Sequence, residues 1–237
     1  MLGKNLIAGT NRTQASILTE HIRRDIIAGV FQPNSKLKLR ELSERYEVGT
    51  VPLREALSRL VLSGFVQAED QRGFKVTSAS SDELLDITQI RQEAEANALR
   101  KSIKNGTLEW EAGVIAALHR LTNTPMLDPN SSSVLNPEWE KAHDNFHTIL
   151  ISACGSAWLM RICALLREQF DRYRQMSVMS ERTSSRNVVK EHQALCDAVI
   201  ARDAEKACHL LSDHFAATTQ LALERLTKFA NESHRHQ

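Results

Sequence analysis

Histidine spacing is the feature of this sequence that most directly indicates chemistry. His143 and His147 are four residues apart, which on a helix places them about 40° apart around the axis and about 6 Å apart along it. Two imidazoles at that separation can share one metal ion. His192 and His214 each interrupt an apolar stripe, in EHQALCDAVI and LLSDHFAATT, and could face the same interior. The alternative for each histidine is a hydrogen-bonded core residue.

Arginines indicate a second kind of chemistry, because the planar guanidinium binds guanine O6 and N7, or a phosphate, through paired hydrogen bonds. The residues expected to contact DNA gather in the N-terminal third of the chain and are Arg40, Thr50, Arg54, Arg59, Arg72 and Gly73. The alternative is that Arg40 and Arg54 are solvated surface charges, or pair with a nearby glutamate such as Glu41, Glu44 or Glu55.

Two further arginines are candidates to bind a small carboxylic acid. Arg91 could enter the same cavity as the histidines and hold a carboxylate through paired hydrogen bonds, with the metal taking the other end of the acid. Its alternative partner is Glu95, one helical turn further on. Arg174, beside Arg172 and Tyr173, is a further candidate for a second carboxylate, although helix faces normally carry such charges.

Hydrophobic periodicity predicts the elements that position the DNA-contacting residues. Apolar residues at three- and four-residue steps predict helices over 14–28, 39–46 and 51–63. The short link between the last two contains Gly49, a tight turn typical of motifs that set a second helix into the DNA major groove. Extended runs over 65–68 and 74–77 predict a hairpin, or wing, with Arg72 and Gly73 at its tip. Residues 12–78 therefore form the expected DNA-binding domain.

From Ser80 onward the sequence predicts helices and no convincing strand. Ser80 and Glu83 have the spacing of a capping box. The linker TNTPMLDPNSSSVLNP contains three prolines and is expected to be a mobile surface loop. The predicted fold class is mostly α: a winged helix-turn-helix of three helices and a small β-hairpin, then an all-α six-helix bundle over 81–229. Its expected helices are 81–104, 107–122, 137–153, 156–179, 185–201 and 203–229.

Composition excludes several classes of protein. The chain has 237 residues, of which 42% are apolar and 25% charged, proportions that suit one or two globular domains and neither a disordered nor a fibrous protein. No apolar run is long enough for a membrane span or a signal peptide, so the expected location is the cytoplasm. Cys154, Cys163, Cys196 and Cys208 lack CxxC spacing and are expected to be reduced core thiols.

Net charge is distributed unevenly along the chain. Residues 1–80 carry 12 Lys and Arg against 8 Asp and Glu, a balance of +4, so the remainder carries −3 of the overall +1. A modest basic excess in the N-terminal third is compatible with phosphate contacts, but it is too common on protein surfaces to indicate nucleic acid by itself.

The string RELSERYEVGTVPLREALSRLVLSGFV, followed by RGFKV, resembles the winged helix-turn-helix of the GntR family of bacterial transcription regulators. The resemblance implies that Arg40, Thr50 and Arg54 touch operator DNA, and that Gly73 approaches the minor groove. This chain has Gly49-Thr50 where the family usually has Ser-Arg. A base-contacting arginine and a capping serine are thereby lost, so no operator sequence is carried over from the family.

Residues 81–229 resemble the FadR C-terminal ligand-binding domain of the same family, with its R-x-x-[apolar]-E signature at Arg91 to Glu95. The resemblance implies a metal site in which histidine replaces the usual aspartate. Asp144, one position further on, would point about 100° away and is a poor substitute. Four neutral imidazoles would keep the charge at +2, which favours an anionic effector. The expected ion is zinc, with nickel or manganese as alternatives, and the implied ligands are His143, His147, His192 and His214.

The resemblance implies a homodimeric repressor of dicarboxylate or amino-acid catabolism genes, released from operator DNA by glutarate, 2-hydroxyglutarate or a similar acid. Two alternatives remain at this point. One is a metal-dependent enzyme, although HDNFH lacks the glutamate of HExxH proteases, and GxSxG, P-loop and dinucleotide motifs are absent. The other is a purely structural metal that holds the helices together.

Overall fold

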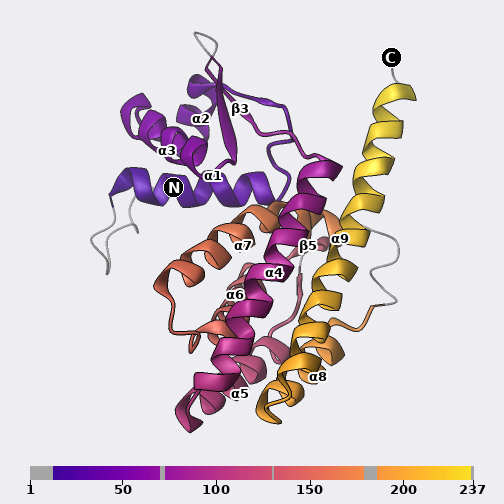
Figure 1. The fold of residues 1–237 in the computed structure, drawn as a ribbon. Helices are drawn as coiled ribbons and strands as arrows, with labels where there is room; N and C mark the ends of the chain where they lie inside the picture. Colours follow the sequence, from indigo (N-terminus) through magenta and orange to yellow (C-terminus); the bar gives the residue numbers. More distant parts are fainter. Residues whose placement is uncertain (1–12, 70–72, 130, 179–185, 236–237) are drawn as a thin grey trace. The chain divides into compact units, whose positions relative to one another are not determined.

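The structure is a computed structural model that describes residues 13–69, 73–129, 131–178 and 186–235 (Figure 1). The chain divides into two compact units, Met1–Ala79 and Ser80–Gln237. Each unit has its own cluster of buried apolar side chains. Because each core is self-contained, each unit is considered by itself below.

The first unit contains three helices and a small antiparallel sheet. The helices are α1 (Gln14–Ile27), α2 (Leu39–Tyr46) and α3 (Thr50–Leu62), close to the predicted ranges. The strands are β1 (Lys36–Leu37), β2 (Val66–Glu69) and β3 (Gly73–Val76), in the order β1-β3-β2. The hairpin of β2 and β3 was predicted, whereas β1 lies between the first two predicted helices, where no strand was predicted. A two-residue strand is too short to show periodicity, and its pairing with Phe74 and Lys75 is long-range.

The tight turn predicted between α2 and α3 is present, and a glutamate supplies its left-handed residue. Glu47, and not Gly49, has the left-handed backbone, with φ of 54° against −71° at the glycine. The reversal is held by Ser43, whose hydroxyl donates to the backbone oxygen of Val48 at 2.5 Å and whose own backbone oxygen accepts from the Val48 N–H. Gly49 instead caps α3 without a side-chain hydrogen bond.

The second unit is a helical domain, with the six predicted helices and one short strand pair in the part of the chain that is described. In Figure 1, α4 and α9 run alongside one another over much of their length. Ser80 caps α4, because its hydroxyl oxygen accepts from the Glu83 N–H, which is one half of the predicted capping box. The other half does not form, since the Glu83 carboxylate contacts Arg172 and Tyr173. The helices are α4 (Ser81–Asn105), α5 (Leu108–Thr122), α6 (Pro137–Ile151), α7 (Ala157–Val178), α8 (Val188–Ile200) and α9 (Ala204–Arg235).

The linker between α5 and α6 corrects the prediction of a strand-free surface loop. It contains an antiparallel pair, β4 (Leu127–Asp128) and β5 (Ser131–Leu135). Leu135 is only 1% exposed and packs into the helical core, and its N–H donates to the side-chain oxygen of Gln175 on α7. The prolines and serines of the linker suggested a loop, but Leu135, with Met126 and Leu127, packs it against the core of the bundle.

The four cysteines are free and buried, which confirms the prediction of reduced core thiols. Burial raises the pKa of Cys163 to about 12 and that of Cys196 to about 11. Such thiols are inert towards oxidation and metal binding. Among the described residues, no helix combines the length and the apolar character that a membrane crossing needs.

Candidate functional site

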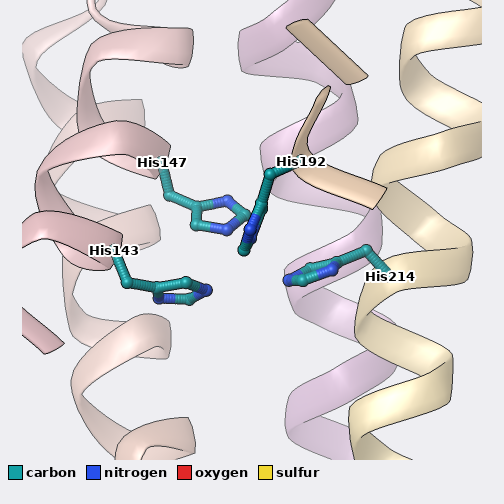
Figure 2. A group of neighbouring side chains, drawn as sticks. All are labelled: His143, His147, His192 and His214. Carbon is teal, nitrogen blue, oxygen red and sulfur yellow. The ribbon is translucent and has the colours of Figure 1, made fainter. Parts of the chain in front are cut away.

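Three helices bring the four predicted histidines together inside the second unit. His143 and His147 lie on α6, His192 on α8 and His214 on α9, and all four side chains are buried. Figure 2 shows their rings directed towards a common point. One nitrogen from each ring lies within 4.8 Å of the corresponding nitrogens of the others. Residues 71 positions apart in sequence thus form one cluster of possible ligands.

The protonation of these rings suits metal binding. Burial lowers the pKa of each histidine below its usual value, and for His143 the neighbouring histidines and Arg174 add to that effect. The neutral imidazole, with a free nitrogen lone pair, is therefore the favoured form.

Some ring nitrogens of the cluster have no hydrogen-bond partner among the described residues, and a metal ion could satisfy them. Both ring nitrogens of His147 and Nε2 of His192 are buried without a hydrogen-bond partner among the described residues. A buried polar atom without a partner costs about 1–3 kcal/mol. Coordination of a divalent ion by the cluster would satisfy one nitrogen of each ring, so the residues present fit a transition-metal ion such as zinc.

Glu191 orients one of the histidines, a role that was not predicted. His214 Nδ1 lies 2.8 Å from a Glu191 carboxylate oxygen, so its N–H donates to Glu191, and Nε2 is left with the lone pair that could bind a metal ion. Arg186 donates to both oxygens of the same carboxylate, at 2.7 and 2.5 Å. Burial acts to raise the pKa of Glu191, but the hydrogen bonds from Arg186 and His214 outweigh it and lower the pKa to about 2. The sequence signal is the Glu-His pair at 191–192.

A cavity beside the histidines is lined by the two arginines predicted to bind an effector, Arg91 and Arg174, and also by Arg186. The space open to a water-sized molecule is about 20 Å³, room for about one water molecule. The cavity is otherwise lined mostly by apolar and aromatic side chains, among them Trp139, Phe170 and Phe215.

Arg91 lines the cavity and also forms the ion pair with Glu95 that the sequence offered as the alternative to binding a carboxylic acid. Its Nε donates to Glu95 at 2.7 Å, with both side chains buried. The guanidinium lies over the ring of Phe215, 3.8 Å from the centroid, and 4.9 Å from that of Phe170. Glu95 also faces Arg167 at 3.7 Å, so it is shared between two guanidinium groups. Arg91 is thus held rigidly at the cavity wall.

Arg174 is the arginine in direct contact with the histidine cluster. Its Nη1 lies 3.3 Å from Nδ1 of His143, and it is paired with Asp171 at 2.8 Å and Glu140 at 3.3 Å. The adjacent candidates are directed elsewhere, because Arg172 pairs with Glu83, and the Tyr173 hydroxyl contacts Glu83 and accepts from the Ser80 N–H.

Asp144 lies outside the cluster. Its side chain is 57% exposed and faces Arg167 at 3.3 Å. The acidic group next to His143 in the sequence therefore does not replace the aspartate expected in the resembling domain, and the cluster remains an all-histidine ligand set.

The predicted DNA-contacting residues of the first unit differ in exposure and in whether they already form ion pairs. Thr50 and Arg54 are exposed on the first turns of α3. Arg40 on α2 pairs with Glu44, yet its side chain remains exposed. Arg59 pairs with Glu55 at 2.7 Å and donates to Ser16. Arg72 lies outside the described residues.

Gly73, the first residue of β3, has a φ of 97°. A side chain is strained in that conformation even though space around the residue is open, which explains a glycine at this point of the wing.

Comparison with known proteins supports this architecture. Residues 14–76 match the "Bacterial regulatory proteins, gntR family" domain, and residues 86–217 match the FCD domain. The chain is 43% identical over 202 residues to the HTH-type transcriptional regulator BphR of Paraburkholderia xenovorans LB400, covering 84% of this chain and 81% of that protein. It is 38% identical over 198 residues to the HTH-type transcriptional repressor GlaR of Escherichia coli K12, covering 81% and 88%.

Solved structures show the same fold at lower identity. McbR/YncC of E. coli superposes with a TM-score of 0.73 at 18% identity, covering 91% of this chain and 99% of that one. A GntR regulator from Rhodococcus sp. RHA1 gives a TM-score of 0.67, also at 18% identity, covering 90% and 99%. The chain therefore belongs to the GntR family of bacterial transcription regulators, with an FCD domain as its second unit, and it is a regulator and not an enzyme.

Proposed function

We propose that this regulator is a homodimeric repressor that is released from its operator by a small carboxylic acid bound beside a metal ion in the FCD domain. The acid is of the glutarate or 2-hydroxyglutarate type, the ion is zinc, and the regulated genes serve dicarboxylate or amino-acid catabolism. Operator binding places its action in the bacterial cytoplasm.

The proposal rests on one observation: four buried imidazoles converge beside a cavity that Arg91 and Arg174 line. A bound zinc ion would supply a positive centre and coordination positions for a carboxylate oxygen. Neutral histidines do not offset the charge of the ion, so the site favours an anion. Arg174, next to His143, would receive a second carboxylate, and Arg91 stiffens the wall of the same cavity through Glu95 and the two phenylalanine rings.

The size of the cavity supports a coupling between acid binding and conformation. The open space of about 20 Å³ is far smaller than a four- or five-carbon acid needs. Entry of the acid therefore requires side chains and helices around the histidines to move, so a state with a wider cavity is selected by the ligand. In a homodimer, such a movement changes the spacing of two winged helices over half-sites about one helical turn apart.

Linkage sets the scale of this coupling. An acid that weakens operator binding tenfold must bind the free protein tenfold more tightly than the DNA complex, which corresponds to about 1.4 kcal/mol. That free energy is small compared with the packing of a helical domain, so a modest rearrangement of the cavity wall suffices.

Elemental analysis of the purified protein, followed by calorimetric titration with glutarate and 2-hydroxyglutarate, tests the proposal. We expect about one zinc per chain, loss of the zinc in His147→Ala, and micromolar acid binding only by the metal-loaded protein. His209→Ala is the matched control, because this histidine lies on α9 with a side chain that is 76% exposed. It should retain both zinc and acid binding.

A purely structural metal is the second candidate, favoured by the complete burial of a four-histidine set, which can saturate a tetrahedral ion. In that case zinc would be present, neither acid would bind, and chelation would unfold the FCD domain. Absence of metal from the wild-type protein, after purification without chelators and incubation with zinc, would contradict both candidates.

A further inference from the structure

We propose that Val51 recognises the C5-methyl group of a thymine in the major groove of the operator. Val51 is the second residue of α3, and it is 77% exposed. The inference rests on operator binding by the first unit and adds a specificity-determining residue to it. It uses neither the histidine cluster nor the effector.

The packing of α3 decides which of its faces is free. Leu53, Ala56, Leu57 and Leu60 are completely buried in the core of the first unit, so the opposite face of the helix is turned outward. Val51, Arg54 and Ser58 are exposed, and helical geometry places them within about 60° of one another around the axis. A valine therefore shares the outward face with an arginine that is able to read guanine or bind phosphate.

The position along the helix matters as much as the face. Residues in the N-terminal turns of a recognition helix contact base edges. Gly49, the N-cap residue of α3, carries no side chain, and Val51 is itself 77% exposed, so Val51 is open to an approaching duplex. Because Val51 lies about 4.5 Å along the axis from Arg54, its target base should lie one or two base pairs from the Arg54 contact.

The chemistry of valine limits what it can recognise. An isopropyl group forms no hydrogen bond to a phosphate or to a donor or acceptor on a base edge. The one apolar group that the major groove presents is the thymine methyl. Valine is also β-branched and restricted in χ1, so contact with that methyl costs little side-chain entropy. An exposed valine in this turn thus distinguishes thymine from cytosine, and a T·A pair from a G·C pair.

The experiment begins with selection of high-affinity sites from random DNA by the full-length protein, without added acid. Each thymine of the selected site is then replaced singly by deoxyuridine, which removes only the methyl group. We expect one thymine in each half-site at which this replacement weakens wild-type binding about fourfold, the effect of withdrawing about one methyl group from apolar contact. Val51→Ala should bind the thymine site about fourfold more weakly and be indifferent to uracil there.

Leu62→Ala is the matched control. Leu62 is 89% exposed on the same side of α3, but eleven residues place it about 16.5 Å further along the axis, beyond the first turns. This variant should bind like the wild type and retain the full uracil effect. Circular dichroism should show both variants folded, since neither side chain is buried.

Two results would overturn the assignment. If Val51→Ala keeps the full uracil effect, or if no thymine shows one, Val51 does not recognise a methyl group, while operator binding stands. If selection enriches no sequence at all, operator recognition and the role of Val51 fail together. The two failures are therefore distinguishable.

Discussion

Individual side chains around the histidine cluster divide into the proposed metal ligands and the groups that orient them. Glu191 belongs to the second kind, because it accepts from His214 Nδ1 and is itself held by two hydrogen bonds from Arg186. Such carboxylates fix the tautomer and orientation of a ligating ring and raise its basicity. The conformation of His214 is thus set before any ion arrives.

Replacement of Glu191 tests this orienting role. Glu191→Gln removes the charge and one acceptor for Arg186 with little change of shape, so zinc affinity should fall roughly 10-fold or more. Competition with a chromophoric chelator measures the affinity. Glu205→Gln is the control, since Glu205 is exposed on α9 and pairs only with the exposed Arg100. Equal zinc affinity in the Glu191 and Glu205 variants would show that Glu191 does not act through His214.

At the scale of single elements, α3 separates its two predicted DNA-contacting arginines. Arg54 is exposed near the start of the helix, whereas Arg59 is engaged by Glu55 on α3 and by Ser16 on α1. A guanidinium already held within its own domain has less to gain from DNA than an exposed one.

The two arginines should therefore respond differently to truncation. Arg54→Ala should weaken operator binding roughly 10-fold or more, because a base or phosphate contact contributes about 1–3 kcal/mol. Arg59→Ala should weaken it less than about threefold. Fluorescence anisotropy at a fixed salt concentration measures both affinities. A larger loss for Arg59→Ala than for Arg54→Ala would reverse the assignment.

The connection between α4 and α5 depends on a glycine for space and not for backbone conformation. Gly106 has an ordinary φ of −65°. A Cβ atom there would lie 2.1 Å from the ring of Trp110, whose Nε1–H donates to the backbone oxygen of Ile149. The indole ring is therefore packed against the bare backbone of the turn and joins α5 to α6.

Gly106→Ala should lower the free energy of unfolding of the FCD domain by about 1–3 kcal/mol, the usual cost of overpacking. Urea denaturation followed by tryptophan fluorescence measures the change. Gly113→Ala is the control, because Gly113 lies within α5 of the same domain and a Cβ there would make an ordinary contact, 3.7 Å from Ile149; alanine is the better helix former, so this variant should not lose stability. Equal stability of the two variants would show that the turn relaxes without cost.

At the scale of the whole molecule, the two units have separate cores, and all four histidines belong to the second. A ligand that binds one folded unit stabilises that unit through mass action. The histidine cluster joins α6, α8 and α9, so zinc should act on the FCD domain as a whole and leave the winged helix-turn-helix unchanged.

Calorimetry of the full chain should therefore show two unfolding transitions. Zinc should raise the midpoint temperature of one of them, that of the FCD domain. At a free zinc concentration 100 times the Kd, the FCD domain should gain about 2.7 kcal/mol, which corresponds to roughly 5 to 10 °C. His147→Ala should abolish the shift and leave the transition of the first unit in place. A zinc-dependent shift of both transitions, or of neither, would contradict the assignment of the metal to this domain.

The elements with strong local signals were predictable from the sequence. The helices around Leu57 and Phe146 show regular apolar spacing, and Ser80 marks the start of α4 by its capping chemistry. The hairpin of β2 and β3 likewise follows from a local alternation. Features that depend on contacts distant in sequence were missed, namely strand β1 and the β4–β5 pair. The left-handed Glu47 was missed because a glutamate gives no local signal for that backbone conformation.

The site shows the same division. Residue type and spacing alone determined that His143 and His147 share a helix face, because a four-residue step is a property of the local backbone. The convergence of His192 and His214 with them was implied by family resemblance, and their positions are decided by the packing of α8 against α5 and α9, and of α9 against α4 and α7. Only the tertiary structure decided that Glu191 and Arg186 orient His214, that Arg91 lies over the rings of Phe170 and Phe215, and that Val51 is exposed. Burial and pairing depend on what approaches from elsewhere in the chain, and helical periodicity carries no information about that.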